Sequence, residues 1–366
     1  MTHEKHNQSS TSLIITIGAL VIFGLIMLAS ASSVVGYAGF NDSYYFLKHQ
    51  LTHGLVPGIL FFIIFSQISY KFLQKKANLF FLGSIILLIL VFIPGLGIIR
   101  HGAHSWVGWG SLSIQPSEIA KLGLLIYLAA WFTKNKEHQN SISQGLVPFV
   151  IIVGIVLGLI ALQPDLGTLF IIALMSLAIF YASGVKLSYI FSLCMAGIIG
   201  VVGLIKIAPY RMQRLTVFLN PEIDPQGIGY HINQALLAIG SGGIFGMGLG
   251  HSRQKFQYLP EVAGDSIFAV MGEEFGFIIT TLFVLVYLFF IFKIIKISKR
   301  TTNNFARLFT IGLAVWVGGQ AFLNMGAMVG IMPLTGVPLA LVSFGGTALM
   351  TTLAACGILV NINKNN

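Results

Sequence analysis

Long apolar runs recur along the whole chain, and they constrain its fold more than any other feature. A run of about 17 to 25 apolar residues matches a helix that crosses the roughly 30 Å hydrocarbon core of a bilayer. Because 56% of the residues are hydrophobic and only 9% are charged, the composition excludes an ordinary soluble protein. We therefore predict an all-α integral membrane protein with about ten transmembrane helices. The ten runs lie at residues 13–33, 51–70, 78–97, 118–133, 144–163, 166–184, 187–206, 266–292, 308–330 and 337–360.

These runs divide the chain into five parts. Short polar tails at 1–12 and 361–366 flank spans 1–7 (13–206), one large loop (207–265) and spans 8–10 (266–360). The first run ends in Ala29-Ser30-Ala31, which resembles a signal-peptidase site. Its apolar core is longer than the roughly 7 to 15 residues of a cleaved signal, so we predict a retained helix.

Basic residues indicate the orientation, because loops on the cytoplasmic side are enriched in Lys and Arg. If both termini are cytoplasmic, thirteen of the 21 Lys and Arg residues lie on the inner side, and nine of the eleven acids lie outside or within the membrane. The inner residues are Lys5, Lys71, Lys75, Lys76, Lys134, Lys136, Lys186, Lys293, Lys296, Lys299, Arg300, Arg307 and Lys364. The net charge of +10 therefore reflects topology, and no basic run is interleaved with aromatics as a nucleic-acid groove requires.

Several kinds of site are excluded by the residue pattern. The sequence has no His/Cys metal cluster, no Walker loop and no Ser-His-Asp spacing, and His101 and His104 alone are weak evidence for a metal. Cys194 and Cys356 each lie in an apolar run, so we predict two packing residues without a disulfide. The metal ligands, if any, stay unassigned.

Ionisable residues gather between Gly246 and Gly276. Arg253, Lys255, Glu261 and Asp265 precede the eighth run, and Glu273 and Glu274 lie inside it. Because an ionisable residue in a bilayer is costly, it marks a function by default. We expect the chemistry here, with Asp265 as the strongest carboxylate candidate; the alternative is that Asp265 only caps the helix that follows.

Two other polar positions have a structural and a functional interpretation. Glu118 and Lys121 are three residues apart on one helical face, so they form either a buried ion pair or part of an anion-binding site. Asp165 follows Gln163-Pro164 in a tight turn, where an Asp commonly caps the next helix. We favour the cap for Asp165 over a role in binding.

The large loop and the last run contain irregular stretches. The loop holds Arg211 and Arg214, a helical pattern over residues 229–239 and a glycine cluster over 240–250. A loop of this length is usually functional. In the tenth run, residues 336–339 and 343–347 interrupt the apolar pattern, which predicts close helix packing or a broken helix that faces a cavity.

One carboxylate with several cations suits the transfer of a sugar from a lipid diphosphate. That reaction needs a base for the attacking hydroxyl, while the diphosphate leaves as a stable anion without a proton. Lys121, Arg211, Arg214, Arg253 and Lys255, or a divalent ion, could offset the charge on the leaving group. Composition alone does not choose this reaction over transport.

An ordered set of motifs resembles the SEDS family (shape, elongation, division and sporulation) of peptidoglycan glycosyltransferases over nearly the whole chain. The neighbourhoods of Arg211 and Lys255 are similar to the FtsW branch, which acts in division, more than to the RodA branch, which acts in elongation. The matching stretches are Ile114 to Glu118 with Lys121, Gln163 to Thr168, Pro209 to Arg211 with Arg214, Asn220-Pro221 with Asp224-Pro225, Gly229-Tyr230 with Gln234, Gly248 to Gly250, Tyr258 to Glu261, Asp265 to Gly276, and Ser343 with Gly345-Gly346.

The resemblance implies a function and partners. It implies that Asp265 activates the 4-hydroxyl of an acceptor sugar, which attacks lipid II with inversion to give a β-1,4 glycan strand and undecaprenyl diphosphate. It also implies a divalent cation (Mg²⁺ or Mn²⁺), a class B penicillin-binding transpeptidase and other division-complex membrane proteins as partners, and a place in the bacterial cytoplasmic membrane at the septum. The predicted substrate-binding residues are Glu118, Lys121, Arg211, Arg214, Lys255, Arg253, Asp165 and Ser343.

Three positions depart from the family pattern, and three other functions stay open. His104 lies in a loop that usually carries a basic residue, Phe344 replaces a common Tyr, and Ala340 replaces a frequent Pro. The alternatives are a lipid II flippase with a path lined by Glu118, Lys121, Glu273 and Glu274, a scaffold for a transpeptidase, and the equivalent polymerase of cell elongation. We prefer the enzyme over the flippase and the scaffold because the acids crowd the outer end of the predicted bundle and do not form a relay through both leaflets.

Overall fold

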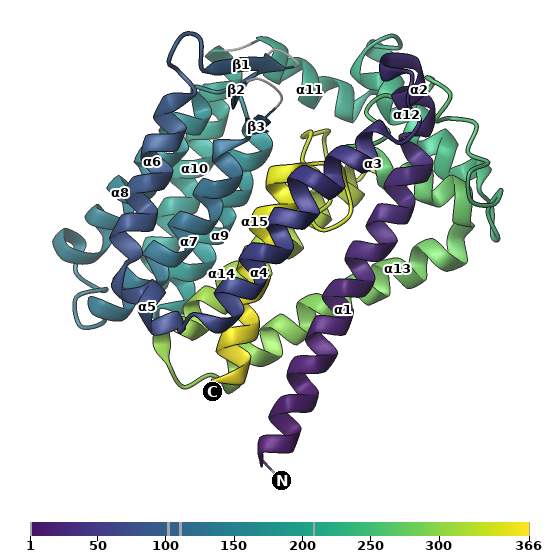
Figure 1. The fold of residues 1–366 in the computed structure, drawn as a ribbon. Coiled ribbons are helices and arrows are strands. Elements are labelled where there is room, and N and C mark those ends of the chain that lie inside the picture. Colours follow the sequence, from purple (N-terminus) through teal and green to yellow (C-terminus); the bar gives the residue numbers. More distant parts are fainter. Residues whose placement is uncertain (1, 101–102, 110–111, 208, 366) are drawn as a thin grey trace.

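Each predicted apolar run contains a helix in the computed structural model, which describes residues 2–100, 103–109, 112–207 and 209–365 (Figure 1). Six helices of this described part are long and apolar enough to cross a membrane, and three more are shorter apolar helices. The all-helical multi-pass architecture is confirmed, whereas the count of ten crossings remains a prediction. The helices of the runs are α1 (Thr2–Ala31), α3 (Tyr45–Gln50) continued by the π-helical η1 (Leu51–Leu55) and α4 (Val56–Gln67), α6 (Ala77–Leu90), α7 (Pro116–Lys134), η2 (Ile142–Leu146) continued by α8 (Val147–Ala161), α9 (Leu166–Ala182), α10 (Leu187–Ile207), α13 (Ile267–Arg300), α14 (Asn304–Met328) and α15 (Gly346–Lys364).

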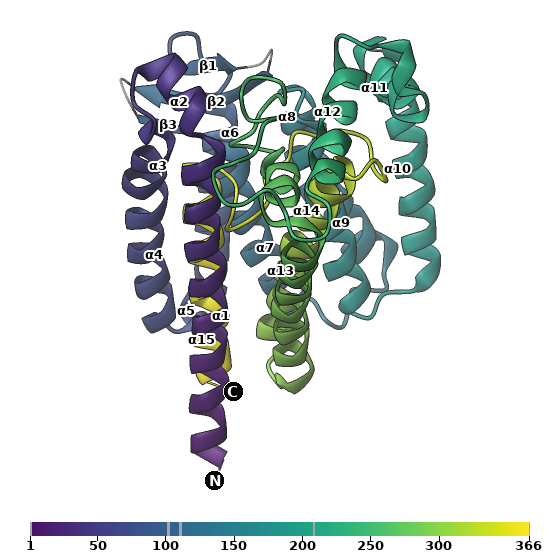
Figure 2. The same cartoon turned by 90° about the vertical axis from the view of Figure 1, so that its right-hand side faces the viewer.

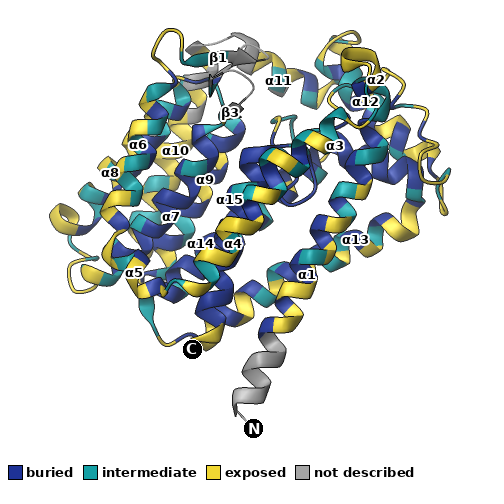
Figure 3. Cartoon of the chain, viewed as in Figure 1, coloured by how far each residue is buried: buried dark blue, intermediate teal, exposed yellow. Residues whose placement is uncertain are grey.

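Helices α7, α14 and α15 form the centre of the bundle, where most of their side chains are buried (Figure 3). Close approach depends on small residues: a Cβ atom on Gly357 of α15 would lie 2.5 Å from the carbonyl oxygen of Phe62 on α4. Helix α10 lies at the margin of the bundle (Figure 2). It exposes apolar side chains such as Phe191 and Ile199. A helix whose apolar side chains point away from the protein is suited to face lipid.

Most of the remaining structure lies in connections at the end of the bundle away from the two termini, whereas the short helix at 70–75 lies at the other end (Figure 1). The loop between α6 and α7 contains a three-stranded antiparallel sheet in the order β1-β2-β3, which is an addition to the predicted all-α class. In the large loop, the helical pattern over 229–239 is confirmed by α12. The elements are α2 (Ser33–Phe40), α5 (Tyr70–Lys75), β1 (Gly97–Arg100), β2 (Ala103–Trp109), β3 (Leu112–Ile114), α11 (Pro209–Leu219), the 3₁₀ helix η3 (Pro221–Ile223) and α12 (Ile228–Ser241).

Some predicted boundaries are wrong. The tenth run was predicted to be helical from residue 337, but α15 begins only at Gly346. Gly336 and Leu341 adopt φ values of +69° and +68°, which a right-handed helix cannot contain, so residues 337–345 form an irregular segment. The third run stops being helical at Leu90, and α13 continues beyond the predicted end at 292 to Arg300.

Helix α13 is broken at Gly276, where φ is +69° and ψ is −173°. In an unbroken helix, the N–H groups of residues 277 and 278 would donate to the carbonyl oxygens of residues 273 and 274. The segment 243–248 pairs with the freed groups instead, so the break leaves these four polar groups satisfied. The bonds run from Met247 N to Glu273 O (3.0 Å), Gly248 N to Glu274 O (2.9 Å), Phe277 N to Gly243 O (2.9 Å) and Ile278 N to Ile244 O (3.2 Å). The glycine cluster is therefore a paired segment and not a free turn.

Replacement of Gly276 by alanine is expected to destabilise the protein by more than about 1 kcal/mol, because a non-Gly residue is strained at positive φ. The new Cβ would also lie 2.2 Å from the backbone nitrogen of Gly246. Thermal unfolding in detergent measures the effect. Gly203→Ala in α10 is the control, since a Cβ there meets no atom within 4 Å. Equal unfolding temperatures for the two variants would contradict this account of the break.

Candidate functional site

Asp265 lies in the turn that leads into α13, outside the helix itself. The residue that occupies the N-cap position is Ser266, and its side chain makes no capping hydrogen bond. The alternative that Asp265 serves as the N-cap of this helix is therefore not what the structure shows. Its side chain is half-buried and remains open to a role in chemistry.

Three distant elements hold this turn in place. From α14, the amide of Asn324 donates to the carbonyl oxygen of Asp265 at 2.9 Å. From the irregular segment, the backbone N–H of Phe344 donates to the carbonyl oxygen of Ala263 at 2.8 Å. From α12, Nε2 of His231 lies 2.6 Å from the Ser266 hydroxyl. The position of Asp265 is thus set by parts of the chain that are far apart in sequence.

The tautomer of His231 follows from the single proton of Ser266. The Ser266 hydroxyl donates to the carbonyl oxygen of Pro260 at 2.7 Å, so the imidazole must donate through Nε2. Burial lowers the pKa of His231 to about 4, so this ring is neutral near pH 7. A neutral ring with a proton on Nε2 is what this contact requires.

Asp265 itself has an unusual acidity. Burial raises the pKa of Asp265 to about 7, and the negative charge of Glu261 contributes in the same direction. Arg214 and the backbone N–H groups of Asp265 and Ser266 act in the opposite direction. Since the carboxylate is the basic form, the fraction of Asp265 that can accept a proton increases as pH rises through about 7.

Glu118 and Lys121 form a salt bridge in the centre of the bundle. Nζ of Lys121 lies 2.7 Å from Oε1 of Glu118, and the two side chains are only 1% and 2% exposed. The same ammonium donates to Oε1 of Gln320 at 3.1 Å and lies 5.1 Å from the ring centroid of Trp316. The ion-pair interpretation is correct, and Oε2 of Glu118 is a buried oxygen with no hydrogen-bond partner in the described structure.

Helix α14 connects this pair to the Asp265 turn. Gln320 and Asn324 are four residues apart, so they lie on one face of the helix. Gln320 donates to the carbonyl oxygen of Pro338 at 2.7 Å, and Asn324 donates to that of Val337 at 2.9 Å as well as to Asp265. Sequence reasoning missed both amides, although polar residues in an apolar helix are a usable signal.

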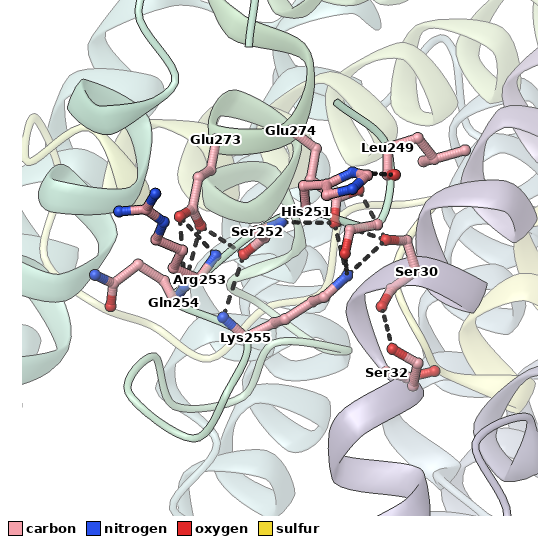
Figure 4. Close-up of polar contacts among 12 residues, drawn as sticks. Ser30, Ser32, Leu249, His251, Ser252, Arg253, Gln254, Lys255, Glu273 and Glu274 are labelled. Atoms are coloured by element: carbon pink, nitrogen blue, oxygen red, sulfur yellow. Dashed lines mark hydrogen bonds and ion pairs between the residues drawn. The ribbon is translucent and has the colours of Figure 1, made fainter. Parts of the chain in front are cut away.

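Lys255 is buried against Glu274 and α1 (Figure 4). Its ammonium lies 2.9 Å from Oε1 of Glu274, and it also donates to the Ser30 hydroxyl and to the carbonyl oxygen of Gly250. Ser30 donates to both carboxylate oxygens of Glu274. This ion pair therefore fastens the large loop to α1 and α13, and the ammonium has protein partners on several sides.

The neighbouring acid, Glu273, binds the same loop through backbone groups (Figure 4). The N–H of Arg253 donates to its Oε1 at 2.8 Å, and the Ser252 hydroxyl donates to its Oε2. The guanidinium-bearing side chain of Arg253 is exposed. Glu273 and Glu274 together hold residues 250–255 against the beginning of α13.

The remaining predicted site residues have separate places. Asp165 caps α9, because its Oδ1 accepts from the N–H of Thr168 at 3.0 Å. Ser343 is buried in the irregular segment, where its hydroxyl accepts from the N–H of Leu339. Arg214 is half-buried in α11 and donates to the carbonyl oxygen of Leu334 at 3.4 Å. The side chains of Arg211 and His104, and all of His101, lie outside the described residues.

The site therefore contains one carboxyl group, that of Asp265, whose pKa lies near neutral pH. It lies at one end of the bundle, within electrostatic range of the guanidinium of Arg214. The other acids of the apolar helices, Glu118, Glu273 and Glu274, are held by protein groups. Among the described residues, no group of three or more His, Cys, Asp or Glu side chains could hold a metal ion. The arrangement suits proton abstraction from a ligand that approaches Asp265.

A helical bundle with these buried charges, and one base-like carboxylate at its end, defines a multi-pass membrane protein with a polar site near one membrane surface. Residues 10–366 match the family model described as a cell cycle protein, which groups FtsW, RodA and SpoVE. The chain belongs to this family. The predicted membership of the SEDS family is thereby confirmed.

Relatives and solved structures match this chain over nearly its whole length. The chain is 38% identical over 364 residues to stage V sporulation protein E of Bacillus subtilis (strain 168), covering 100% of this chain and 99% of that protein. It is 35% identical over 344 residues to the probable peptidoglycan glycosyltransferase FtsW of Geobacter sp. (strain M18), covering 94% of each. The crystal structure of the rod shape determining protein RodA of Thermus thermophilus superposes with a TM-score of 0.70 at 26% identity, covering 97% of this chain and 96% of that chain. A chain from a peptidoglycan synthase complex that coordinates polymerization and crosslinking gives a TM-score of 0.77 at 26% identity, with 97% of each chain covered.

Removal of one member of the Glu118–Lys121 pair is expected to cost about 3 to 5 kcal/mol of stability, because the other charge stays buried without a partner. Glu118→Ala and Lys121→Ala test this by unfolding in detergent. The double variant Glu118→Leu with Lys121→Met is expected to be more stable than either single variant, because it buries no charge. If the double variant loses as much stability as the two single variants together, the two charges do not depend on each other.

Proposed function

We propose that this protein is a peptidoglycan glycosyltransferase that polymerises lipid II into β-1,4 glycan strands. The observation that carries the proposal is Asp265, whose pKa of about 7 suits a general base at neutral pH. Full-length similarity to a probable peptidoglycan glycosyltransferase supports the same reaction.

In the proposed step, the carboxylate of Asp265 takes the proton from the 4-hydroxyl of the acceptor sugar. The hydroxyl oxygen attacks the anomeric carbon of lipid II, and the bond from that carbon to the diphosphate oxygen breaks. Undecaprenyl diphosphate takes the electron pair of the broken bond and leaves without needing a proton, while the configuration at the anomeric carbon is inverted. One base is sufficient here, in contrast to the two carboxylates of glycosidases.

Charge on the leaving diphosphate requires cations. Arg214 lies within electrostatic range of Asp265, and Arg253 is exposed in the same large loop, so both are proposed to contact the diphosphate. A divalent cation, Mg²⁺ or Mn²⁺, is also part of the proposal, and Glu261, whose charge interacts with that of Asp265, would be the carboxylate that helps to hold it while Asp265 stays free as the base. Such an ion would supply further stabilisation of the departing phosphate oxygens.

The proposed setting is the bacterial cytoplasmic membrane, with both termini in the cytoplasm and the Asp265 turn on the outer face. This orientation places thirteen of the 21 Lys and Arg residues on the cytoplasmic side, as the positive-inside rule requires. A class B penicillin-binding transpeptidase is the proposed partner, in keeping with the related synthase complex in which polymerization and crosslinking are coordinated. We propose a role at the division septum because several relatives are named FtsW. The sporulation relative and the RodA structure define the alternative roles.

The flippase alternative requires charged groups along a path through the membrane. Glu118 is paired with Lys121, and Glu274 is paired with Lys255, with every one of these side chains at most 3% exposed. Pairs that are closed and buried in this way support structural roles more than an open headgroup path. The enzymatic proposal does not need them to open.

The direct test is glycan-chain formation from labelled lipid II by the purified protein with its transpeptidase partner. Asp265→Asn keeps the shape of the side chain but removes the base, so polymer formation is expected to fall by at least about 10² to 10⁴-fold. Asp42→Asn, which alters a half-buried acid that pairs with Lys48 at the same end of the bundle, is the matched control and is expected to retain activity.

Equal polymerisation by wild type and Asp265→Asn would rule out Asp265 as the base. If the wild type makes no polymer with a partner of verified activity, transport or scaffolding becomes the better explanation. Unfolding temperatures of both variants establish that a loss of activity is not a loss of fold.

A further inference from the structure

Residues 242–249, which we call the glycine segment, expose large apolar side chains. Ile244 is 61% exposed, Phe245 is 80% exposed and Leu249 is 48% exposed. Such a cluster is unfavourable in water, and the chemistry of the reaction gives it no role. What covers it depends on how deep this segment lies relative to the membrane.

The length of helix α1 between two polar clusters indicates that depth. Near one end, Ser12 and Thr16 bind the ammonium of Lys293 on α13, and near the other, Ser30 binds Glu274 and Lys255. From Ser12 to Ser30, α1 rises about 27 Å at 1.5 Å per residue. Because this matches the roughly 30 Å hydrocarbon core, the two polar clusters mark its two boundaries.

The tip of the glycine segment lies on the membrane side of the Ser30 cluster. Its carbonyl oxygens at Gly243 and Ile244 accept from Phe277 and Ile278, which follow Glu274 toward the Lys293 end of α13. Phe277 is 69% exposed and Leu282, further along α13, is 57% exposed. The apolar surface of the tip is therefore continuous with the lipid-facing surface of α13.

Irregular backbone that faces lipid does not occur in the hydrocarbon core, where its polar groups would lack partners. Among the described residues, the N–H groups of Ile244 and Phe245 have no hydrogen-bond partner, so the backbone of the tip fits the head-group level, where water reaches it. The exchange of hydrogen bonds at the break of α13 provides partners for the carbonyl oxygens of Gly243 and Ile244 and for the N–H groups of Met247 and Gly248. After the tip, the chain returns to the polar side of the membrane boundary. The buried Lys255–Glu274 pair and the bond from Lys255 to Gly250 hold residues 250–255 at that boundary.

We propose that residues 242–249 form an interfacial anchor: the side chains of Ile244 and Phe245 insert among the upper acyl chains of the bilayer, while the backbone of the tip stays at the level of the head groups. The occupant of the exposed apolar patch is lipid. The inserted tip anchors the large loop 20 to 21 residues before Asp265, so it sets the height of the Asp265 turn above the hydrocarbon core. This proposal depends on the membrane architecture alone and not on the glycosyltransferase reaction.

The test uses the full-length protein in vesicles of phosphatidylcholine and phosphatidylglycerol. Cys194 and Cys356 are first replaced by alanine, and a single cysteine then carries an environment-sensitive fluorophore at Phe245→Cys. Lipids with a nitroxide near the carbonyl end of the acyl chain quench a fluorophore that lies among the upper acyl chains. Phe277→Cys on α13 is the positive control, and Ile223→Cys, which is 58% exposed in η3, is the apolar control outside the glycine segment.

The proposal predicts quenching at Phe245→Cys comparable to that at Phe277→Cys and clearly greater than that at Ile223→Cys. Quenching at Phe245→Cys no greater than at Ile223→Cys, with strong quenching at Phe277→Cys, would overturn it. The result is independent of catalysis, so failure of this proposal leaves the lipid II assay unaffected.

Discussion

The structure depends on one constraint, which is that a charge in a low-dielectric interior needs a partner. The acids that the chain places in its apolar helices satisfy it: Glu118 binds Lys121, Glu274 binds Lys255, and Glu273 binds backbone N–H groups of the loop. Each of these contacts joins separate elements or fills the bundle centre, so the cost of burying charge also determines the packing. Asp265 stands apart, because burial and a like-charged neighbour raise its pKa and leave it reactive.

Helix α14 transmits this organisation through two amides. Gln320 accepts from the central ammonium and binds the irregular segment, while Asn324 binds that segment and the Asp265 turn. A helix buried on most faces is rigid, so the turn is fixed relative to the central ion pair. The break in α13 adds a second restraint, since the glycine segment fits into it and the large loop cannot move independently of that helix.

Local rules predicted what local chemistry decides. The apolar runs predicted the helices, and the spacing of three residues predicted the ion pair between Glu118 and Lys121. The tight turn before α9 predicted that Asp165 caps this helix. Contacts between distant residues were not predictable: nothing in the sequence links Lys255 to Glu274 and Ser30, or His231 to Ser266. The interruption of the tenth run was visible in the sequence, but the start of its helix at Gly346 was not, because the positive φ of Leu341 reflects its neighbours and not its own preference.

The most direct measurement of the central claim is the pH dependence of kcat/KM for glycan polymerisation, which reports the pKa of the essential base in the free enzyme. For the wild type, the account predicts a rate that rises with pH through about 7, the pKa of Asp265. Glu261→Gln removes a negative neighbour and shifts this limb to lower pH, whereas Arg214→Gln removes a positive one and shifts it to higher pH. A limb that is absent, or that stays at the same pH in both variants, would contradict the assignment of Asp265 as a base tuned by its surroundings.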